Sequence, residues 1–163
     1  MLNCTQNRID QGVYVVVLRV LSSFQIKKKN FNWDLKAGIY TYFGSALGKT
    51  STSLSHRLFR HFKSTKRIFW HIDLLTTNKN VEKLQAYYTT QNSDLECELL
   101  QQFIQNYSNT HVIRNFGSSD CRSKCRGHLL YLSNNQEELL HLNDYFLQRG
   151  WSIYNYTNES ISD

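Results

Sequence analysis

One acidic residue stands among apolar neighbours in a segment that the sequence predicts to be helical. In a helix that begins at Asp94, at ~100° per residue, Glu96 falls inside an apolar arc with Leu95 and Leu99. Glu98 falls on the opposite side. An ionised carboxylate in apolar surroundings is costly unless a cation or hydrogen-bond donors compensate it. Glu96 is therefore a candidate metal ligand, or one half of a structural salt bridge with Arg or Lys.

Tyrosine, arginine and histidine residues form a second candidate set. Side chains alternate faces along a strand, so Tyr40 and Tyr42 share one face of a predicted strand, and Tyr14 lies on its predicted antiparallel partner. Arg57 and His61 lie one turn apart on the following predicted helix, beside its apolar stripe. Phenol, guanidinium and imidazole groups together suit phosphate binding and proton transfer. The simpler alternative is that tyrosines favour strands and have no further role.

Two tripeptides, GIY and YFG, almost touch in residues 38–44. A single strand presents Tyr40 and Tyr42 side by side along one edge, whereas two tyrosines that meet at one phosphate must come from facing strands. The sequence therefore predicts that the partner of YFG is not the adjacent GIY but the GVY of residues 12–14, on the facing strand. Tyr40 is predicted to lie outside the reactive group.

Further cations are candidates for contact with a phosphate backbone. Arg60 points to solvent on the helical wheel, Lys63 ends the same predicted helix, and His71 follows in the string FWHIDLL. A histidine beside Trp70 has a plain alternative as a core residue with satisfied hydrogen bonds.

Cysteine and histidine also cluster towards the C-terminal end. Cys121, Cys125 and His128 form C-x₃-C-x₂-H, and Cys97 is a possible fourth thiolate. Such close spacing can hold Zn²⁺, although it is not the usual C-x₂-C and two basic residues intervene. A local structural role without metal is the alternative.

The charge of the chain favours a polyanionic partner. The 163 residues carry a formal net charge of +6 with a pI near 9.2. The cations gather at residues 27–29, 56–67 and 122–126. A clustered basic surface attracts phosphates, which makes nucleic acid the first partner to consider beside a simply solvated surface.

Hydropathy patterning predicts a cytoplasmic protein with reduced cysteines. No secretory leader opens the chain, and the longest apolar run, residues 13–21, contains Arg19. We therefore expect no membrane association. No motif indicates a small-molecule cofactor.

The elements predict one α+β domain over residues 1–151. It has a motif core at 12–106, then a Cys/His loop with a C-terminal strand and helix at 107–151. A polar, flexible tail follows at 152–163. The expected strands are 12–20, 24–27, 37–44, 81–90 and 128–132. One expected helix runs from Ser51 or Ser53 to Lys63, a second begins at Asp94, and a third runs from an Asn135–Glu138 capping box to Gly150. The expected loops are 30–36 and 106–125.

The order of these motifs resembles the GIY-YIG nuclease superfamily. The matching pieces are GVY at 12–14, YFG at 42–44, RLFRH with Arg57 and His61, and DLECELL with Glu96. The strings YFGSALG, RHF, FWHIDLL, LECEL and FGSSDC are similar to those of its Uri-type branch, and together they cover residues 12 to about 132.

The resemblance implies a small, about three-stranded antiparallel sheet flanked by helices, and a metal-dependent endonuclease that hydrolyses DNA. Glu96 would hold one Mg²⁺ or Mn²⁺ on the scissile phosphate. Tyr14 would be the general base, with Tyr42 and His61 as a proton relay, and Arg57 would neutralise the transition state.

Two features depart from this family pattern. The two halves of the signature are usually separated by about one turn, so the distance between Tyr14 and Tyr42 in this chain requires an inserted extended segment. The superfamily also commonly has an Asn beyond the Glu, for which Asn106, Asn109 and Asn115 all compete.

Two alternatives to a DNA endonuclease stay open. One is a non-catalytic module that binds nucleic acid with a loop stiffened by zinc, and the other is RNA as the substrate. The sequence sets no oligomeric state, and cleavage of both strands by one active site would require dimerisation or successive nicks.

Overall fold

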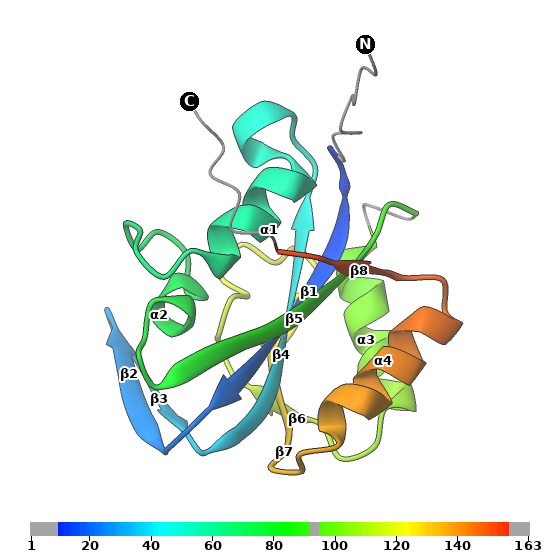
Figure 1. Cartoon of the computed structure of the whole chain (residues 1–163). Coiled ribbons are helices and arrows are strands. Elements are labelled where there is room, and N and C mark those ends of the chain that lie inside the picture. Colours follow the sequence, from blue (N-terminus) through cyan, green and yellow to red (C-terminus); the bar gives the residue numbers. More distant parts are fainter. Residues whose placement is uncertain (1–9, 92–94, 157–163) are drawn as a thin grey trace.

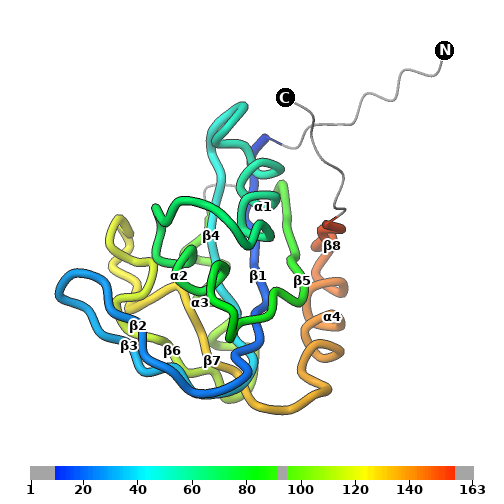
Figure 2. The backbone as a smooth tube through the Cα atoms, turned by 60° about the vertical axis from the view of Figure 1, so that its left-hand side comes forward, coloured from blue at the N-terminus to red at the C-terminus, as the bar shows by residue number. Residues whose placement is uncertain are grey.

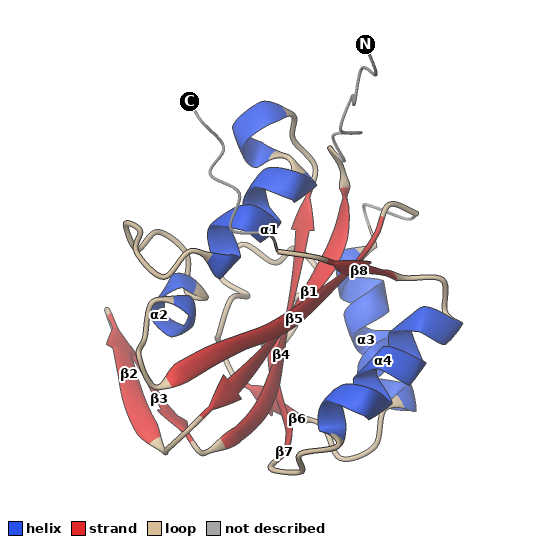
Figure 3. Ribbon diagram, viewed as in Figure 1, coloured by secondary structure: helices blue, strands red, loops and turns tan. Residues whose placement is uncertain are grey.

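A computed structural model describes residues 10–91 and 95–156 as an α+β fold with helices on both faces of a central sheet (Figures 1 and 3). The elements are β1 (Gly12–Val20), β2 (Phe24–Lys28), β3 (Phe31–Leu35), β4 (Gly38–Ala46), a 3₁₀ turn (Thr50–Thr52), α1 (Leu54–Phe62), α2 (Asp73–Thr76), β5 (Val81–Thr89), α3 (Glu96–Asn106), β6 (His111–Ile113), β7 (Leu129–Ser133), α4 (Glu138–Gln148) and β8 (Ser152–Tyr154). No helix in these two described ranges is long and apolar enough to cross a membrane.

The central sheet is antiparallel and has six strands in the order β6-β7-β4-β1-β5-β8. β1 lies inside it, between β4 and β5, and its run of valines is buried. Such a continuous apolar run is what a strand covered on both faces requires. The predicted strand pair β1–β4 and the predicted strand β5 are confirmed.

Two hydrophobic cores form, one on each face of the sheet. The backbone shows the β2–β3 hairpin and α4 on opposite sides of the central strands (Figure 2). The first lies under α1, α2 and the β2–β3 hairpin and contains Leu58, Ile72 and Trp33. The second lies under α3 and α4 and contains Phe103 and Phe146. Because side chains alternate along β1 and β4, each strand contributes residues to both cores. Tyr14, Tyr40 and Tyr42 point towards the first core.

The sheet is larger than the resemblance implies. β7 confirms the predicted strand at 128–132 and, with β6, extends the sheet beyond β4. β8 extends it beyond β5. β6 and β8 have three residues each, and β6 lies within the predicted loop 106–125. Strands this short carry too little alternation to be recognised, because pairing with a neighbour rather than local propensity holds them.

Two other predicted irregular segments are ordered. Phe31–Leu35, expected as a loop, pairs with β2 as an inserted hairpin, and its buried Trp33 and Leu35 alternate with polar residues. This hairpin is the extended insertion that separates the two halves of the signature. Ser152–Tyr154, expected as part of a flexible tail, pairs with β5. Residues 157–163 lie outside the described part of the chain.

The predicted helices are present, with differences at their ends. Ser53 caps α1, since its Oγ accepts from the amide of His56 at 3.3 Å. The expected first residue of the next helix, Asp94, lies outside the described residues, and α3 begins at Glu96. The capping box was wrong, because Glu138 is instead buried in hydrogen bonds with Tyr107 and Ser133.

The β1–β4 register places Tyr14 directly opposite Gly44, and Val16 opposite Tyr42. A Cβ at position 44 would overlap the ring and hydroxyl of Tyr14. The tyrosine ring therefore lies across the space that glycine leaves. The YFG glycine is required by packing against the GVY tyrosine.

We predict that Gly44→Ala lowers the free energy of unfolding by about 2–3 kcal/mol through overpacking, measured by urea denaturation. Adding Tyr14→Ala should recover part of this loss, because the smaller side chain removes the clash. Gly150→Ala is the control, because a Cβ at position 150 would meet nothing within 4 Å. The φ of 79° at this position is unfavourable for alanine, so this variant should lower the free energy of unfolding by only about 1 kcal/mol. A Gly44→Ala protein as stable as the parent would contradict the packing.

Candidate active site

A pocket of about 420 Å³ opens at one end of the β1–β4 pair. It collects side chains from both strands, from α1, from the start of α3 and from the loop that precedes β7. All five predicted catalytic residues line it: Tyr14, Tyr42, Arg57, His61 and Glu96. Segments far apart in sequence thus bring together two phenols, an imidazole, an arginine and a carboxylate.

Tyr14 and His61 form the buried centre of the pocket. The Tyr14 hydroxyl lies 2.8 Å from His61 Nε2, and both residues are almost fully buried. Burial, followed by the charge of Lys66, lowers the pKa of His61 to about 3. His61 is therefore neutral near pH 7, and in the tautomer with its proton on Nδ1 its Nε2 accepts the hydrogen bond from the phenol.

The electrostatics of the two tyrosines depend on the charges around them. Burial raises the pKa of Tyr14; Arg57 lowers it and Glu96 raises it. Burial also raises the pKa of Tyr42 well above its ordinary value, with Tyr14 and Glu96 adding to the rise. Both phenols are thus neutral in the free protein, and the charge of Glu96 opposes ionisation of each.

Arg57 points its guanidinium into the pocket. Its Nη1 donates to the carbonyl oxygen of Ser45 at 2.7 Å, and its Cζ lies 5.0 Å from the ring centroid of Trp70. The buried Nε has no hydrogen-bond partner within residues 10–91 and 95–156. The guanidinium is therefore held in position with donors left for an anionic ligand.

Glu96 does not lie in the apolar core as the helical wheel predicts. It lies at the first turn of α3, at the pocket, with a side chain that is 19% exposed. Its Oε1 lies 2.6 Å from His128 Nδ1, and its Oε2 accepts from the Ser45 hydroxyl. Two donors hold the carboxylate in place, and each oxygen keeps a second lone pair.

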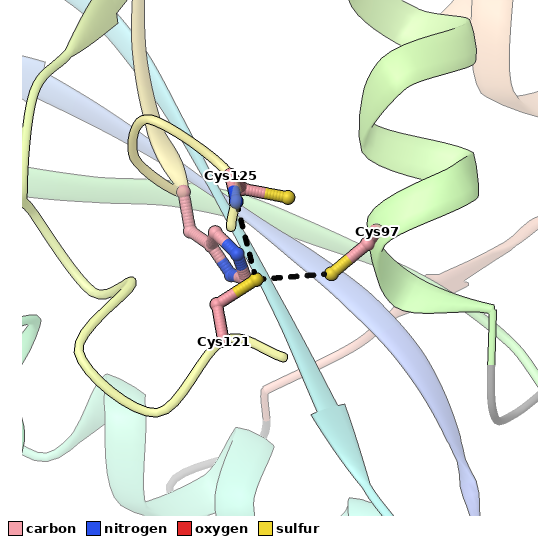
Figure 4. A group of neighbouring side chains, drawn as sticks. Cys97, Cys121 and Cys125 are labelled. Atoms are coloured by element: carbon pink, nitrogen blue, oxygen red, sulfur yellow. Dashed lines mark hydrogen bonds between the residues drawn. The ribbon is translucent and has the colours of Figure 1, made fainter. Parts of the chain in front are cut away.

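The predicted zinc ligands also come together beside this carboxylate. The ligand atoms of Cys97, Cys121, Cys125 and His128 all lie within 4.8 Å of one another. Figure 4 shows Cys97 reaching from α3 towards Cys121 and Cys125 on the loop, with the three side chains turned towards one another. The predicted catalytic site and the predicted zinc site therefore lie side by side. Glu96 of the first precedes Cys97 of the second in the chain, and His128 of the second contacts Glu96.

Residues 13–150 match the family described as domain of unknown function DUF123. The chain belongs to the DUF123 family. No curated protein and no solved structure matches the chain. The matched range contains all twelve predicted site residues of this DUF123 domain, from Tyr14 to His128.

Arg60 does not point to solvent in this DUF123 domain, as the helical wheel suggested. Its guanidinium lies 2.6 Å from Oδ2 of the fully buried Asp73, and Lys66 lies 3.7 Å from Oδ1. The amides of Phe69 and Trp70 also donate to Asp73. Arg60 therefore joins α1 to the start of α2, because a buried carboxylate requires compensating donors.

His71 and Lys63 are not among the residues that line the pocket. His71 Nδ1 accepts from the amide of Gly117 at 2.9 Å, and its ring packs against Trp33 and Phe116. This geometry favours the core-residue alternative for His71. Lys63 is exposed at the end of α1, with its Nζ over the ring of Phe59, so contact with DNA stays a prediction for it.

The pocket of the DUF123 domain includes three polar residues that the sequence did not single out. Ser45 touches both Glu96 and Arg57, Trp70 packs on Arg57, and Asp120 lies on the pocket wall. Ser45 directly follows YFG, and Trp70 lies within FWHIDLL, so both stand in strings already noted. Their roles depend on side-chain contacts across the fold, which one sequence does not reveal.

We predict that the stability of the DUF123 domain falls in mild acid because of His61. The unfolded chain takes up a proton near pH 6.5, whereas the folded chain does so only near pH 3, so stability is lost as the pH falls below about 6.5. The free energy of unfolding should be about 2 kcal/mol lower at pH 5 than at pH 8 from this group alone.

Urea denaturation of His61→Gln at the two pH values tests this assignment, since glutamine keeps an acceptor for Tyr14 but does not titrate. The parent should lose about 2 kcal/mol more than the variant. His56→Gln is the matched control, because His56 is exposed on the same helix. Equal pH dependence in the parent and His61→Gln would show that His61 is not the group responsible.

Proposed function

We propose that this protein is a metal-dependent endonuclease of the GIY-YIG type that hydrolyses phosphodiester bonds in DNA. The observation that carries the proposal is the Tyr14–His61 hydrogen bond, which lies in one pocket with Arg57 and Glu96. The DUF123 match over residues 13–150 and the resemblance of the motifs to the Uri-type branch are consistent with it. A phosphodiesterase needs a base, an anion clamp and a metal ligand at one phosphate, and these residue types supply all three.

The proton path follows from the Tyr14–His61 contact. Tyr14 passes its hydroxyl proton to Nε2 of the neutral His61, and its oxygen takes the proton of the attacking water. The raised pKa of Tyr14 and the lowered pKa of His61 oppose this transfer in the free protein. The charge of Glu96 is part of that opposition, so a cation bound at Glu96 would favour ionisation of Tyr14.

The surroundings of Glu96 fit a hard divalent cation. Its carboxylate is oriented by Ser45 and His128, and Asp120 lies on the same pocket wall. Mg²⁺ typically binds one or two carboxylates and keeps several waters, for which a pocket of about 420 Å³ has room. Bound Mg²⁺ or Mn²⁺ would act as a Lewis acid that stabilises charge on the phosphate oxygens.

Arg57 is the residue proposed to neutralise the transition state. Its contacts with Ser45 and Trp70 fix the guanidinium before substrate arrives, and a group already in position stabilises developing charge without reorganisation. Lysine could not replace this planar arrangement of donors.

The choice of a nucleic acid as substrate rests on the charge of the chain and on its exposed cations. Lys63 and Arg67 are exposed on and after α1, and the chain carries a net charge of +6. Phe69 is 71% exposed between these cations and Trp70, where it can stack on a base. A basic surface with an exposed aromatic ring suits a nucleic acid better than a small phosphate ester.

Plasmid nicking is the direct test of this proposal. Cleavage of supercoiled DNA should require Mg²⁺ or Mn²⁺ and stop with chelator. It should fall by about 10²- to 10⁴-fold in Tyr14→Phe and about 10²- to 10³-fold in Arg57→Lys, with a comparable loss in Glu96→Gln. Branched DNA and RNA, assayed in parallel, establish which nucleic acid is preferred.

Tyr40→Phe is the matched control for these variants. Tyr40 lies on the same face of β4 as Tyr42, but its hydroxyl donates to the carbonyl oxygen of Lys36, 2.8 Å away and outside the pocket. Its loss should leave cleavage unchanged. If Tyr14→Phe and Glu96→Gln both cut as well as the parent, the catalytic assignment fails. Salt-dependent binding without cleavage under any metal would indicate the non-catalytic binding module instead.

The pH dependence of the single-turnover cleavage rate is a separate prediction. Burial raises the pKa of Tyr14, so the phenol stays protonated near neutrality. In the proposed path its proton moves to the neutral His61 and not to solvent, so the rate should be flat between about pH 6 and pH 9. His61 has a pKa of about 3 and should add no step in this range. In His61→Gln, which cannot take the proton, the residual rate should rise about tenfold per pH unit. A parent rate that rises in this way would show that the Tyr14 proton leaves to solvent and would exclude His61 as its acceptor.

A further inference from the structure

We propose that the Cys97, Cys121, Cys125 and His128 cluster binds a structural Zn²⁺, and that His128 couples this ion to Glu96. In this arrangement His128 Nε2 binds zinc while its Nδ1–H holds the carboxylate. The coupling makes His128 a positioning residue for Glu96. Only the part of this inference that concerns the role of Glu96 in cleavage rests on the proposed function.

The cluster has the donors and the size of a zinc site. Three sulfur atoms and one imidazole nitrogen lie within 4.8 Å of one another, and Cys97 Sγ lies 3.4 Å from Cys121 Sγ. Four ligands at about 2.0–2.3 Å from a tetrahedral ion stand roughly 3.3–3.8 Å apart, so small movements would complete the site. Thiolate and imidazole ligands select zinc over the hard Mg²⁺ ion.

The loop that carries two of the sulfurs is shaped to bring them together. Lys124 adopts a φ of 54°, a left-handed conformation that is uncommon for a residue with a side chain. The turn it forms folds Cys125 back onto Cys121, and the amide of Cys125 lies 3.5 Å from the Cys121 sulfur. Backbone in a sparsely populated conformation persists where surrounding contacts hold it, and a bound ion would supply such contacts.

One ring nitrogen of His128 is engaged and the other is free. Nδ1 lies 2.6 Å from Glu96 Oε1, while Nε2 is buried with no hydrogen-bond partner among the described residues. The side chain is only 6% exposed, so water does not readily satisfy Nε2. When Nδ1 donates to the carboxylate, Nε2 of the neutral ring keeps an unused lone pair, and a nitrogen of this ring belongs to the group of atoms that lie within 4.8 Å of one another. Nε2 is therefore the nitrogen that we assign to zinc.

Glu96 is tied to this cluster in two ways. Its neighbour in the first turn of α3, Cys97, is a ligand, and His128 contacts its side chain. A zinc ion would therefore fix the backbone at position 97 and the donor to Oε1 at once. Carboxylates that orient a ligating histidine typically change metal affinity by about 10- to 100-fold when they are replaced.

Metal content and cobalt spectroscopy test the site without any nuclease assay. The purified full-length protein should contain one zinc per chain, and Co²⁺ substitution should give visible absorption of a tetrahedral site with thiolate charge transfer. Cys121→Ser should lose the ion; Arg126→Ala, an exposed loop residue beside Cys125, should keep it. Zinc-free protein that shows no cobalt spectrum, or a Cys97–Cys121 disulfide in its place, would overturn the site.

The coupling is tested by competition with a chelator. Glu96→Gln should weaken zinc binding by about 10- to 100-fold, whereas Glu98→Gln, exposed on the same helix, should not change it. Equal zinc affinities in the two variants would overturn the coupling, whether or not the protein cuts DNA.

His128→Cys separates the two functions of the histidine. A fourth thiolate should retain one zinc per chain, with the cobalt spectrum of a four-sulfur site, but it offers Glu96 no N–H donor. If the parent is a nuclease, this variant should need about 10-fold more Mg²⁺ for half-maximal cleavage. An unchanged Mg²⁺ requirement would show that His128 does not position Glu96.

Discussion

The pairing of β1 with β4 is the constraint on which the rest of this structure depends. Its register sets Tyr14 opposite Gly44, and the ring occupies the space that the glycine leaves. A shift by one residue would turn both tyrosines into the other core and remove the acceptor that His61 provides. The same strands bury the apolar side chains that anchor helices on both faces, so the geometry of the pocket and the stability of the fold are set together.

A gap in the sheet gives the pocket its other wall. β7 pairs with β4 as far as Tyr42, and the amide of Phe43 donates to the carbonyl oxygen of His128. Beyond this point the Ser45 hydroxyl donates a hydrogen bond to Glu96 of α3, and the loop that carries Cys121 lines the adjacent edge of the pocket. A carboxylate carried by a helix on one face thereby reaches residues that belong to the other. On the opposite face of the sheet from α3, the buried Asp73 forms an ion pair with Arg60 and so holds α1 in place.

The sequence was most informative where chemistry and packing coincide. Tyr14, His61 and Glu96 stood out together because the order of their motifs resembles a known superfamily. The cluster of Cys97, Cys121, Cys125 and His128 could be predicted because thiols and an imidazole occur at close spacing. The α+β class and the β1–β4 pair followed from runs of β-branched residues. Arg60 was misplaced because its partner, Asp73, comes from another element, and a helical wheel shows only the faces of a single helix. β6 and β8 were missed because strands of three residues depend on neighbours that the local sequence does not specify.

The last described residues of the chain cover one side of α1. β8 lies along β5, and after it Tyr156 stacks on Phe62 at 5.2 Å and contacts Phe59. These rings cover the side of α1 that faces away from the pocket, whereas Arg57 and His61 line the pocket itself. The pocket is lined where α1, the first turn of α3 and the loop before β7 meet, so the substrate proposed above would enter from that side and not across these rings.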